Sequence, residues 1–187
     1  MVTRCPWPGE DALMQRYHDE EWGVPVQEDR RWMEYIILDA FQAGLSWRTV
    51  LHKRAAFRKV FHDFDALRVA RMTQKQIEAA RQNPGIIRNH LKIKAAVKNA
   101  AALLELAARH GSFNRFIWSF TDGKVVRNRW RRPEEIPAAT PLSDTVSKAL
   151  KQAGFSFVGS TICYAFLQAG GIVNDHLVSC FRYKQLK

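Results

Sequence analysis

The most informative feature of this sequence is a carboxylate, Asp39, on the apolar face of an expected helix. The range 31–43 has helical periodicity, and Trp32, Tyr35 and Ile36 are spaced to share one face. Asp39 falls on the same face, where burying a carboxylate is costly unless a partner needs it. Two interpretations stay open: Asp39 faces a ligand pocket, or it pairs with or caps a neighbouring helix while the aromatic residues form core.

A tight corner follows this helix. Gly44 is a typical helix C-terminal signal, and Ser46 is a good N-cap for a new helix. An acid, an amide and an indole, from Asp39, Gln42 and Trp47, are therefore expected to converge near one point. Such a set is suited to a flat, polar ring that carries positive charge.

Two cysteines and two histidines at opposite ends of the chain form a possible metal site. His176 and Cys180 lie four apart on an expected helix over 175–181 and so share a face. With Cys5 and His18 they make the donor set of a closed tetrahedral zinc site. Such an ion would be structural and would join the first segment of the chain to the last. The alternative is that these are ordinary core or surface side chains.

The range 142–170 predicts two helices joined by a short hairpin with a glycine at each end. Glycine lets the backbone turn tightly and approach a ligand, and the amides that open the second helix form a natural phosphate site. Such a clamp would bind the DNA backbone without reading sequence, although an ordinary helical hairpin fits the pattern equally well. The candidate contacts are Lys151, Gly154, Phe155, Gly159, Ser160 and Thr161.

The charge balance of the 187 residues points to a polyanionic partner. There are 29 Lys and Arg against 18 Asp and Glu, a net charge of +11, which favours nucleic acid over a membrane surface. No apolar run approaches the ~20 residues of a membrane span, and no signal peptide is recognisable, so we expect a cytoplasmic protein. Three widely spaced cysteines argue against a disulfide scaffold.

Helical patterns extend over almost the whole sequence, which predicts an all-α fold in one domain, 1–187. The segment 121–140 is irregular, with Val125 and Val126 as a weak strand candidate. The expected helices are 11–18, 31–43, 47–61, 66–72, 74–82, 87–110, 144–153, 161–169 and 175–181, and the range 113–120 is short and aromatic.

A series of motifs runs from one end of the chain to the other. They are Arg4-Cys5-x-Trp7, Tyr17-His18-Asp19-x-x-Trp22-Gly23-Val24-Pro25, Gln42-Ala43-Gly44-Leu45-Ser46-Trp47, Gly85-Ile86-Ile87-Arg88, Trp118-Ser119-Phe120, Leu150-Lys151-x-x-Gly154-Phe155-x-Phe157-Val158-Gly159, Thr161-Ile162-Cys163-Tyr164 and Val173-Asn174-Asp175-His176. Together they resemble the 3-methyladenine DNA glycosylase I (Tag) family, the constitutive bacterial alkylation-repair glycosylases of the helix-hairpin-helix superfamily.

This resemblance implies a helix-hairpin-helix DNA glycosylase fold, with the hairpin element at about 143–169 and one zinc ion that joins the two ends of the chain. The implied zinc ligands are Cys5, His18, His176 and Cys180. The implied base-binding residues are Tyr17, Trp47 and Asp39, with Trp7, Trp22 and Gln42 beside them. Gly44 and Leu45 would fill the gap that a flipped nucleotide leaves in the duplex.

The implied activity is hydrolysis of the N-glycosidic bond of 3-methyladenine in alkylated duplex DNA by a monomer, with 3-methylguanine as a second candidate substrate. No lysine lies in the range 17–47 that carries the pocket motifs, so we expect a monofunctional enzyme without a covalent intermediate.

Two residues depart from the family pattern. Asp39 stands where the family usually has glutamate, and Met14 stands where it often has tyrosine. Both are expected to touch base recognition. Asp39 is the candidate catalytic residue, and we expect it to act in recognition more than in chemistry. The alternatives are a damage-binding protein, a glycosylase with shifted lesion specificity, and a general basic DNA-binding protein with a structural zinc.

Overall fold

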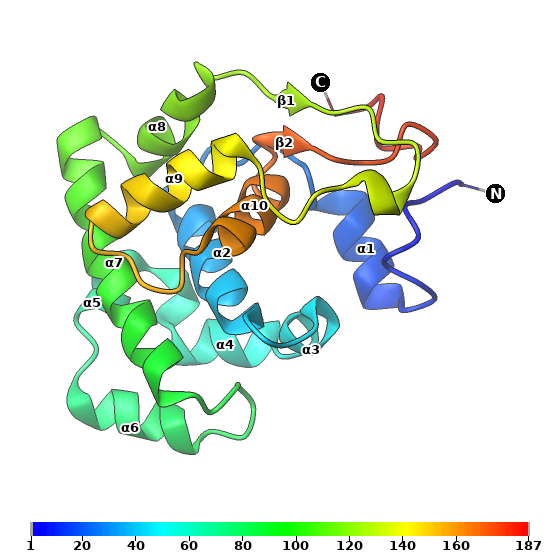
Figure 1. Cartoon of the computed structure of the whole chain (residues 1–187). Coiled ribbons are helices and arrows are strands. Elements are labelled where there is room, and N and C mark those ends of the chain that lie inside the picture. Colours follow the sequence, from blue (N-terminus) through cyan, green and yellow to red (C-terminus); the bar gives the residue numbers. More distant parts are fainter. Residues whose placement is uncertain (1, 187) are drawn as a thin grey trace.

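The computed structural model describes residues 2–186, which fold into a mostly helical structure (Figure 1). The α-helices are α1 (Ala12–Glu20), α2 (Asp29–Gln42), α3 (Trp47–His52), α4 (Arg54–Val60), α5 (Ala66–Ala70), α6 (Gln74–Gln82), α7 (His90–His110), α8 (Phe113–Trp118), α9 (Pro141–Gln152) and α10 (Ser160–Ala169). Short 3-10 helices are η1 (His62–Phe64), η2 (Ser119–Thr121) and η3 (Pro133–Glu135), and the strands are β1 (Val126–Arg127) and β2 (Val173–Asn174). The predicted all-α class is confirmed in that the chain is mostly helical. In the described range no helix is both long and apolar enough to cross a bilayer.

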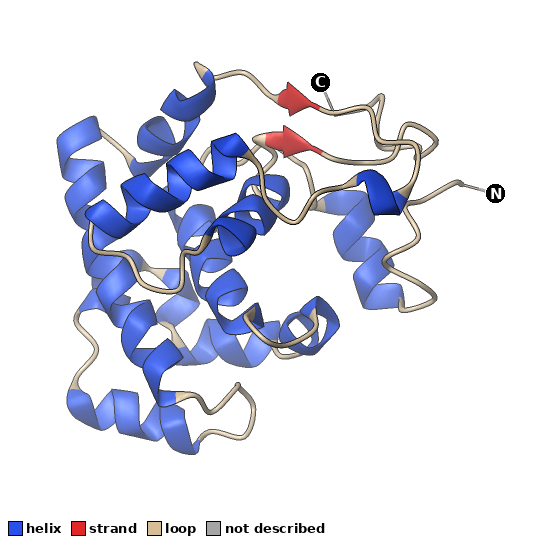
Figure 2. Ribbon diagram, in the orientation of Figure 1, coloured by secondary structure: helices blue, strands red, loops and turns tan. Residues whose placement is uncertain are grey.

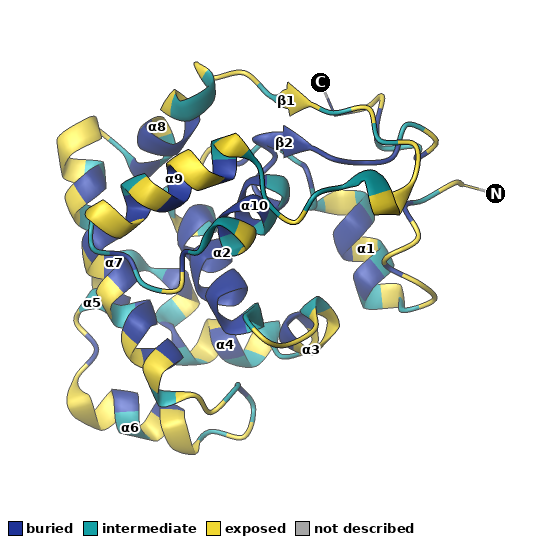
Figure 3. Ribbon diagram, in the orientation of Figure 1, coloured by how far each residue is buried: buried dark blue, intermediate teal, exposed yellow. Residues whose placement is uncertain are grey.

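Helix α2 lies at the centre of the molecule, with α3, α7, α8 and α10 packed against it (Figure 1). Every residue from Trp32 to Phe41 is buried, and α2 is accordingly mostly dark blue in Figure 3. A helix buried on all sides is a core element rather than an amphipathic surface helix. The indole of Trp32 is nevertheless satisfied, because its Nε1 donates to Asn114 Oδ1 at 2.8 Å. Asp39 is therefore carried into the interior by the backbone of a core helix.

Helices α9 and α10 pack against each other and flank the predicted hairpin. A reciprocal cap between Thr140 and Ser143 begins α9. The chain then turns at Gly154, whose φ of +92° lies in the left-handed region that favours glycine. Ser147 Oγ donates to the Val158 carbonyl at 2.6 Å and ties the hairpin to α9. The hairpin is thus held from inside, which leaves its outer edge available.

The two strands form a parallel pair that links the irregular segment 121–140 to the C-terminal segment (Figure 2). Val126 pairs with Val173 and Arg127 with Asn174. The weak strand candidate at 125–126 is therefore a real strand, shifted by one residue.

The predicted helix over 175–181 is wrong, because this segment consists of turns and loop. Two of its backbone amides donate outside the segment: Val178 N to the Trp130 carbonyl at 2.9 Å, and Phe181 N to the Thr3 carbonyl at 2.9 Å. A helix would need those amides for its own ladder.

Several other helix boundaries differ from the sequence-based ranges, and α9 begins at Pro141 rather than at residue 144. The predicted helix 47–61 is divided at Lys53 into α3 and α4. The predicted helix 87–110 begins at His90 instead, because Asn89 is its N-cap and accepts from the amide of Lys92 at 3.1 Å.

Candidate active site and metal centre

A cavity of about 320 Å³ lies between α1, α2, α3 and α10. Its walls are formed by Trp7, Tyr17, Trp22, Asp39, Gln42, Trp47, Ile136, Ala165, Gln168 and Ala169. All six residues that sequence reasoning assigned to a base pocket thus line one cavity. The side formed by Ile136 and α10 was missed.

The α10 side of the cavity had a weak sequence signal. Ala165, Gln168 and Ala169 have i, i+3, i+4 spacing and share a helix face. Gln168 Nε2 donates to Asp175 Oδ2 at 2.7 Å, so the amide is held and its carbonyl oxygen remains to accept from a ligand. Ile136 comes from the irregular segment, where no periodicity could have identified it.

Asp39 is the most unusual group in the cavity wall. It is only 2% exposed, and no group in residues 2–186 donates a hydrogen bond to its Oδ2. Burial raises the pKa of Asp39 well above its ordinary range, since the charged form loses its hydration. The interpretation that Asp39 caps or pairs with a neighbouring helix therefore does not describe this structure. The carboxyl group of Asp39 lines the cavity, and its Oδ2 can accept a hydrogen bond from a ligand.

Aromatic rings surround this carboxyl group. Tyr17 and Trp47 are tilted against each other with ring centroids 5.1 Å apart, and Trp7 and Trp22 meet edge to face at 5.2 Å. Burial raises the pKa of Tyr17, which keeps the phenol protonated. The Trp47 Nε1 is buried and has no acceptor among the described residues. The cavity therefore offers flat apolar walls, hydrogen-bond acceptors at Asp39 and Gln168, and a donor at Trp47.

Met14 does not belong to this cavity. Its side chain is buried in the hydrophobic core from α1, and the lining includes Tyr17, one turn further along the same helix, instead. The departure at position 14 therefore acts on packing behind the cavity.

The corner between α2 and α3 projects from the cavity rim. Gly44 has φ of +79° with nothing within 4 Å of the position of a Cβ atom, and Leu45 is 43% exposed. Ser46 caps α3 by accepting from the Thr49 amide at 3.2 Å, which confirms its predicted role. An apolar side chain thus stands at the tip of a tight turn directly beside Gln42 and Trp47.

The hairpin between α9 and α10 presents some of the predicted DNA contacts and hides others. Lys151 and Thr161 are exposed, and Gly159, the N-cap of α10, has open space where a Cβ atom would lie. The Phe155 side chain is buried and only its backbone can reach a ligand; the exposed aromatic side chain is that of Phe157, at 37%. Sequence periodicity in a turn could not distinguish these two positions. Ser160 Oγ is engaged with Ser143 Oγ at 2.8 Å.

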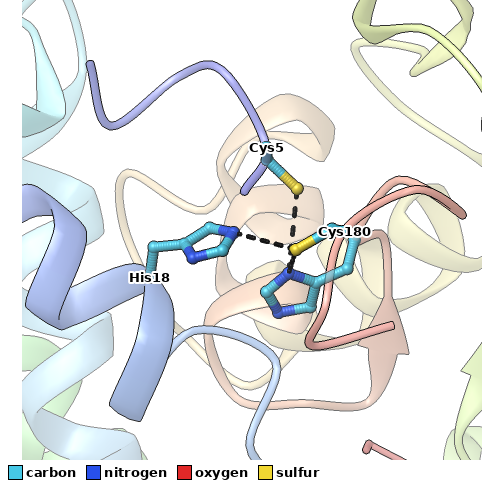
Figure 4. A group of neighbouring side chains, drawn as sticks. Cys5, His18 and Cys180 are labelled. Atoms are coloured by element: carbon cyan, nitrogen blue, oxygen red, sulfur yellow. Dashed lines mark hydrogen bonds between the residues drawn. The ribbon is translucent and has the colours of Figure 1, made fainter. Parts of the chain in front are cut away.

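The predicted metal ligands converge at one buried point, where Figure 4 shows Cys5, His18 and Cys180 pointing toward one another. The ligand atoms of these three and His176 all lie within 4.8 Å of one another. Cys180 Sγ is 3.5 Å from His18 Nε2 and 3.5 Å from His176 Nδ1, and Cys5 Sγ is 3.7 Å from His176 Nδ1. Tetrahedral zinc bonds of about 2.0–2.3 Å place ligand atoms roughly 3.3–3.8 Å apart. The donor set and these three distances therefore fit a zinc ion.

A second layer of contacts orients both imidazoles. His18 Nδ1 lies 2.8 Å from Asp19 Oδ1, and Asp19 pairs with Arg4 at 2.7 Å. His176 Nε2 lies 3.0 Å from the Trp22 carbonyl. Metal-binding histidines usually have such outer partners, which fix the ring and the tautomer. Trp22 also lines the cavity, so the cluster and the cavity share a wall.

Comparison with known proteins agrees with this geometry. The family model described as methyladenine glycosylase matches residues 7–183. Two curated relatives are the DNA-3-methyladenine glycosylase of Haemophilus influenzae, 47% identical over 96% of this chain and 97% of its own, and the DNA-3-methyladenine glycosylase 1 of Escherichia coli, 47% identical over 97% of each chain.

Solved structures are equally similar. A crystal structure of 3-methyladenine DNA glycosylase I superimposes with a TM-score of 0.93 at 49% identity and covers 96% of this chain and 98% of its own. A variant of such an enzyme in complex with 3-methyladenine superimposes with a TM-score of 0.92 at 31% identity, covering 95% of this chain and 96% of its own. This chain therefore belongs to the methyladenine glycosylase family.

Proposed function

We propose that this protein is a DNA repair glycosylase that hydrolyses the N-glycosidic bond of 3-methyladenine in alkylated duplex DNA. The observation that carries the proposal is the buried, unpartnered carboxyl group of Asp39 in an aromatic cavity. A cationic purine supplies what that cavity lacks: an amine donor for Asp39, positive charge, and a flat face for the rings.

The proposed reaction needs little catalytic machinery. Methylation at N3 places positive charge on the base, so the base takes the bonding electron pair and leaves neutral when its bond to the sugar breaks. Water supplies the hydroxyl group that remains on the sugar and releases its other proton to solvent. The enzyme must flip the nucleotide, which costs a few kcal/mol, and then bind the cationic base. The face of Trp47 would attract that cation by roughly 0.5–2 kcal/mol. Asp39 would accept from the exocyclic amine and favour the charged base over neutral adenine.

A monofunctional mechanism is supported by the composition of the cavity wall. A covalent imine intermediate needs an amine nucleophile, and among residues 2–186 no lysine lines the cavity. Lys92, which reaches the end of α2, donates its ammonium group to the backbone carbonyls of Phe41 and Ala43. We therefore propose water as the nucleophile, with 3-methylguanine as a second substrate of the same class.

One structural zinc ion is proposed at the Cys5, His18, His176 and Cys180 cluster. When bound, it would supply a cross-link between the chain ends and no chemistry at the sugar. Its consequence for the cavity is indirect, because His176 lies against the Trp22 carbonyl.

The duplex is proposed to lie across the corner and the hairpin, bound by one copy of the chain. Leu45 would enter the gap left by the flipped nucleotide. The α10 amides at Gly159 and Ser160, together with Lys151, would hold the phosphates, because a helix N-terminus attracts anions. The net charge of +11 supplies the non-specific attraction.

Asp39 in place of the family's usual glutamate supports one alternative, a protein that binds damage or has a shifted lesion range. The test is release of free base from methylated duplex DNA, resolved by chromatography, for the wild type and Asp39→Glu side by side. We expect the wild type to release 3-methyladenine. Release by the Glu variant alone would establish the alternative instead.

A further inference from the structure

Helix α2 ends at the corner of the cavity without a cap of its own. Its last turn has no basic residue, and no backbone capping bond is made by Ala43. Lys92, from the first turn of α7, supplies the missing group: its Nζ donates to the Phe41 carbonyl at 3.0 Å and to the Ala43 carbonyl at 2.5 Å. The cation that a helix C-terminus favours thus comes from another helix.

The buried position of Lys92 lowers the stability of the folded protein. The residue is only 6% exposed, and burying an ammonium group without a carboxylate is unfavourable; no acid within residues 2–186 forms an ion pair with it. Burial lowers the pKa of Lys92. Its own helix also opposes it, since the N-terminal end of a helix dipole is positive. A methionine would fill the same space at lower cost, so packing alone does not explain a lysine here.

The turn that Lys92 supports has little else to hold it. Within the corner, the Leu45 amide donates to the Gln42 carbonyl at 2.7 Å, and Gly44 has no atom within 4 Å of a Cβ position. The α3 side of the corner is fixed separately by the Ser46 cap. The Ala43–Gly44–Leu45 strip therefore depends on the Lys92 contact from inside.

We propose that Lys92 is a positioning residue that holds the Ala43–Leu45 turn in the shape that presents Leu45 to the duplex. This inference rests on the proposed function, because it assigns Leu45 to the gap in the DNA. Lys92 is not among the residues that line the cavity, and it acts through the two carbonyls.

The test is a double-mutant cycle of Lys92→Met with Leu45→Ala. Two readouts are measured: single-turnover release of 3-methyladenine, and affinity for a duplex with a tetrahydrofuran abasic-site analogue, which needs no catalysis. In the wild-type background we expect Lys92→Met to lower both by about tenfold, the scale of a lost charged hydrogen bond. In the Leu45→Ala background the further loss should be less than about twofold, because the two residues act as one unit.

The matched control is Lys94→Met, the same change at an exposed position of α7, and it should leave both readouts unchanged. Affinity for free 3-methyladenine should also stay the same in Lys92→Met. Equal losses in both backgrounds, or a matching loss of free-base affinity, would overturn the proposal. Lys92→Gln enters the same cycle if the Met variant does not fold. A wild type that releases no base contradicts the proposed function instead, while the abasic-site cycle still decides the role of Lys92.

Discussion

Burial of the Asp39 side chain lowers the folding stability of this protein at the site where we propose that the base binds. A carboxyl group that is 2% exposed and lacks a donor at Oδ2 destabilises the folded chain. Native proteins concentrate such violations at functional sites. The sequence placed Asp39 on an inward face but left capping open as an explanation, since a donor from a distant helix has no local signature. Only the three-dimensional structure shows that no such donor arrives.

Asp39→Asn is therefore expected to stabilise the protein. Because the pKa of Asp39 is raised in the folded state, the folded protein binds the proton more tightly, and wild-type stability falls as the pH rises above the unfolded pKa. The asparagine variant does not share this loss. At about pH 8 its free energy of unfolding should exceed that of wild type by about 1 kcal/mol, and the difference should shrink toward about pH 5.

Urea titration at both pH values checks this, with the exposed Glu10→Gln as the matched control. A variant that is less stable than wild type at the higher pH would mean that Asp39 has a partner in solution.

At the scale of elements, the sequence was informative where the hydrogen bonds are local. The ends of helices such as α6 and α10 lie within one residue of their predicted positions. Helical periodicity and caps depend on residues close together in the sequence, so the sequence alone identifies them. The segment after β2 was mispredicted because its partners are distant. Asp175 accepts from Asn128 Nδ2 and Trp130 Nε1, both at 2.7 Å, and from Tyr164 Oη. The buried carboxylate of Asp175 therefore links the irregular segment to α10. No short-range sequence pattern predicts these contacts.

The hairpin element gives a prediction about salt. Lys151 lies in the last turn of α9 with an exposed side chain, and the proposed phosphates lie at the neighbouring N-terminus of α10. Each neutralised phosphate contributes about 0.9 to the slope of log affinity against log salt. Lys151→Gln should lower that slope by about 0.9 for duplex with an abasic-site analogue.

Lys75→Gln removes the same charge from an exposed position on α6 and should leave the slope unchanged. Fluorescence anisotropy over a salt series measures both. A normal slope in Lys151→Gln would remove Lys151 from the DNA interface.

At the scale of the whole molecule, the two ends of the chain meet at the cysteine and histidine cluster. Residue types and the family resemblance identified the four members, although the helical spacing expected for His176 and Cys180 was wrong. They converge because a turn, rather than a helix, brings them together, with the Leu177 amide donating to Cys5 Sγ at 3.4 Å. Hydrogen bonds from the Cys5 thiol and the two imidazoles lower the pKa of Cys180, a favourable state for a metal ligand.

The proposed zinc would close a loop that spans nearly the whole chain, so its removal should be felt as lost stability. Loop-closure entropy for that length corresponds to about 5 kcal/mol, which for a chain of this size lowers Tm by about 10–20 °C. We expect one zinc per chain by elemental analysis, and a Tm decrease of that size on chelation and in Cys180→Ser. Cys163→Ala, at a buried thiol outside the cluster, should keep the metal.

Trp22 joins the cluster to the cavity. Removal of the metal should therefore also lower the affinity for free 3-methyladenine, even at temperatures below Tm. Metal-free protein with unchanged Tm would show that the four side chains hold the chain ends together without an ion.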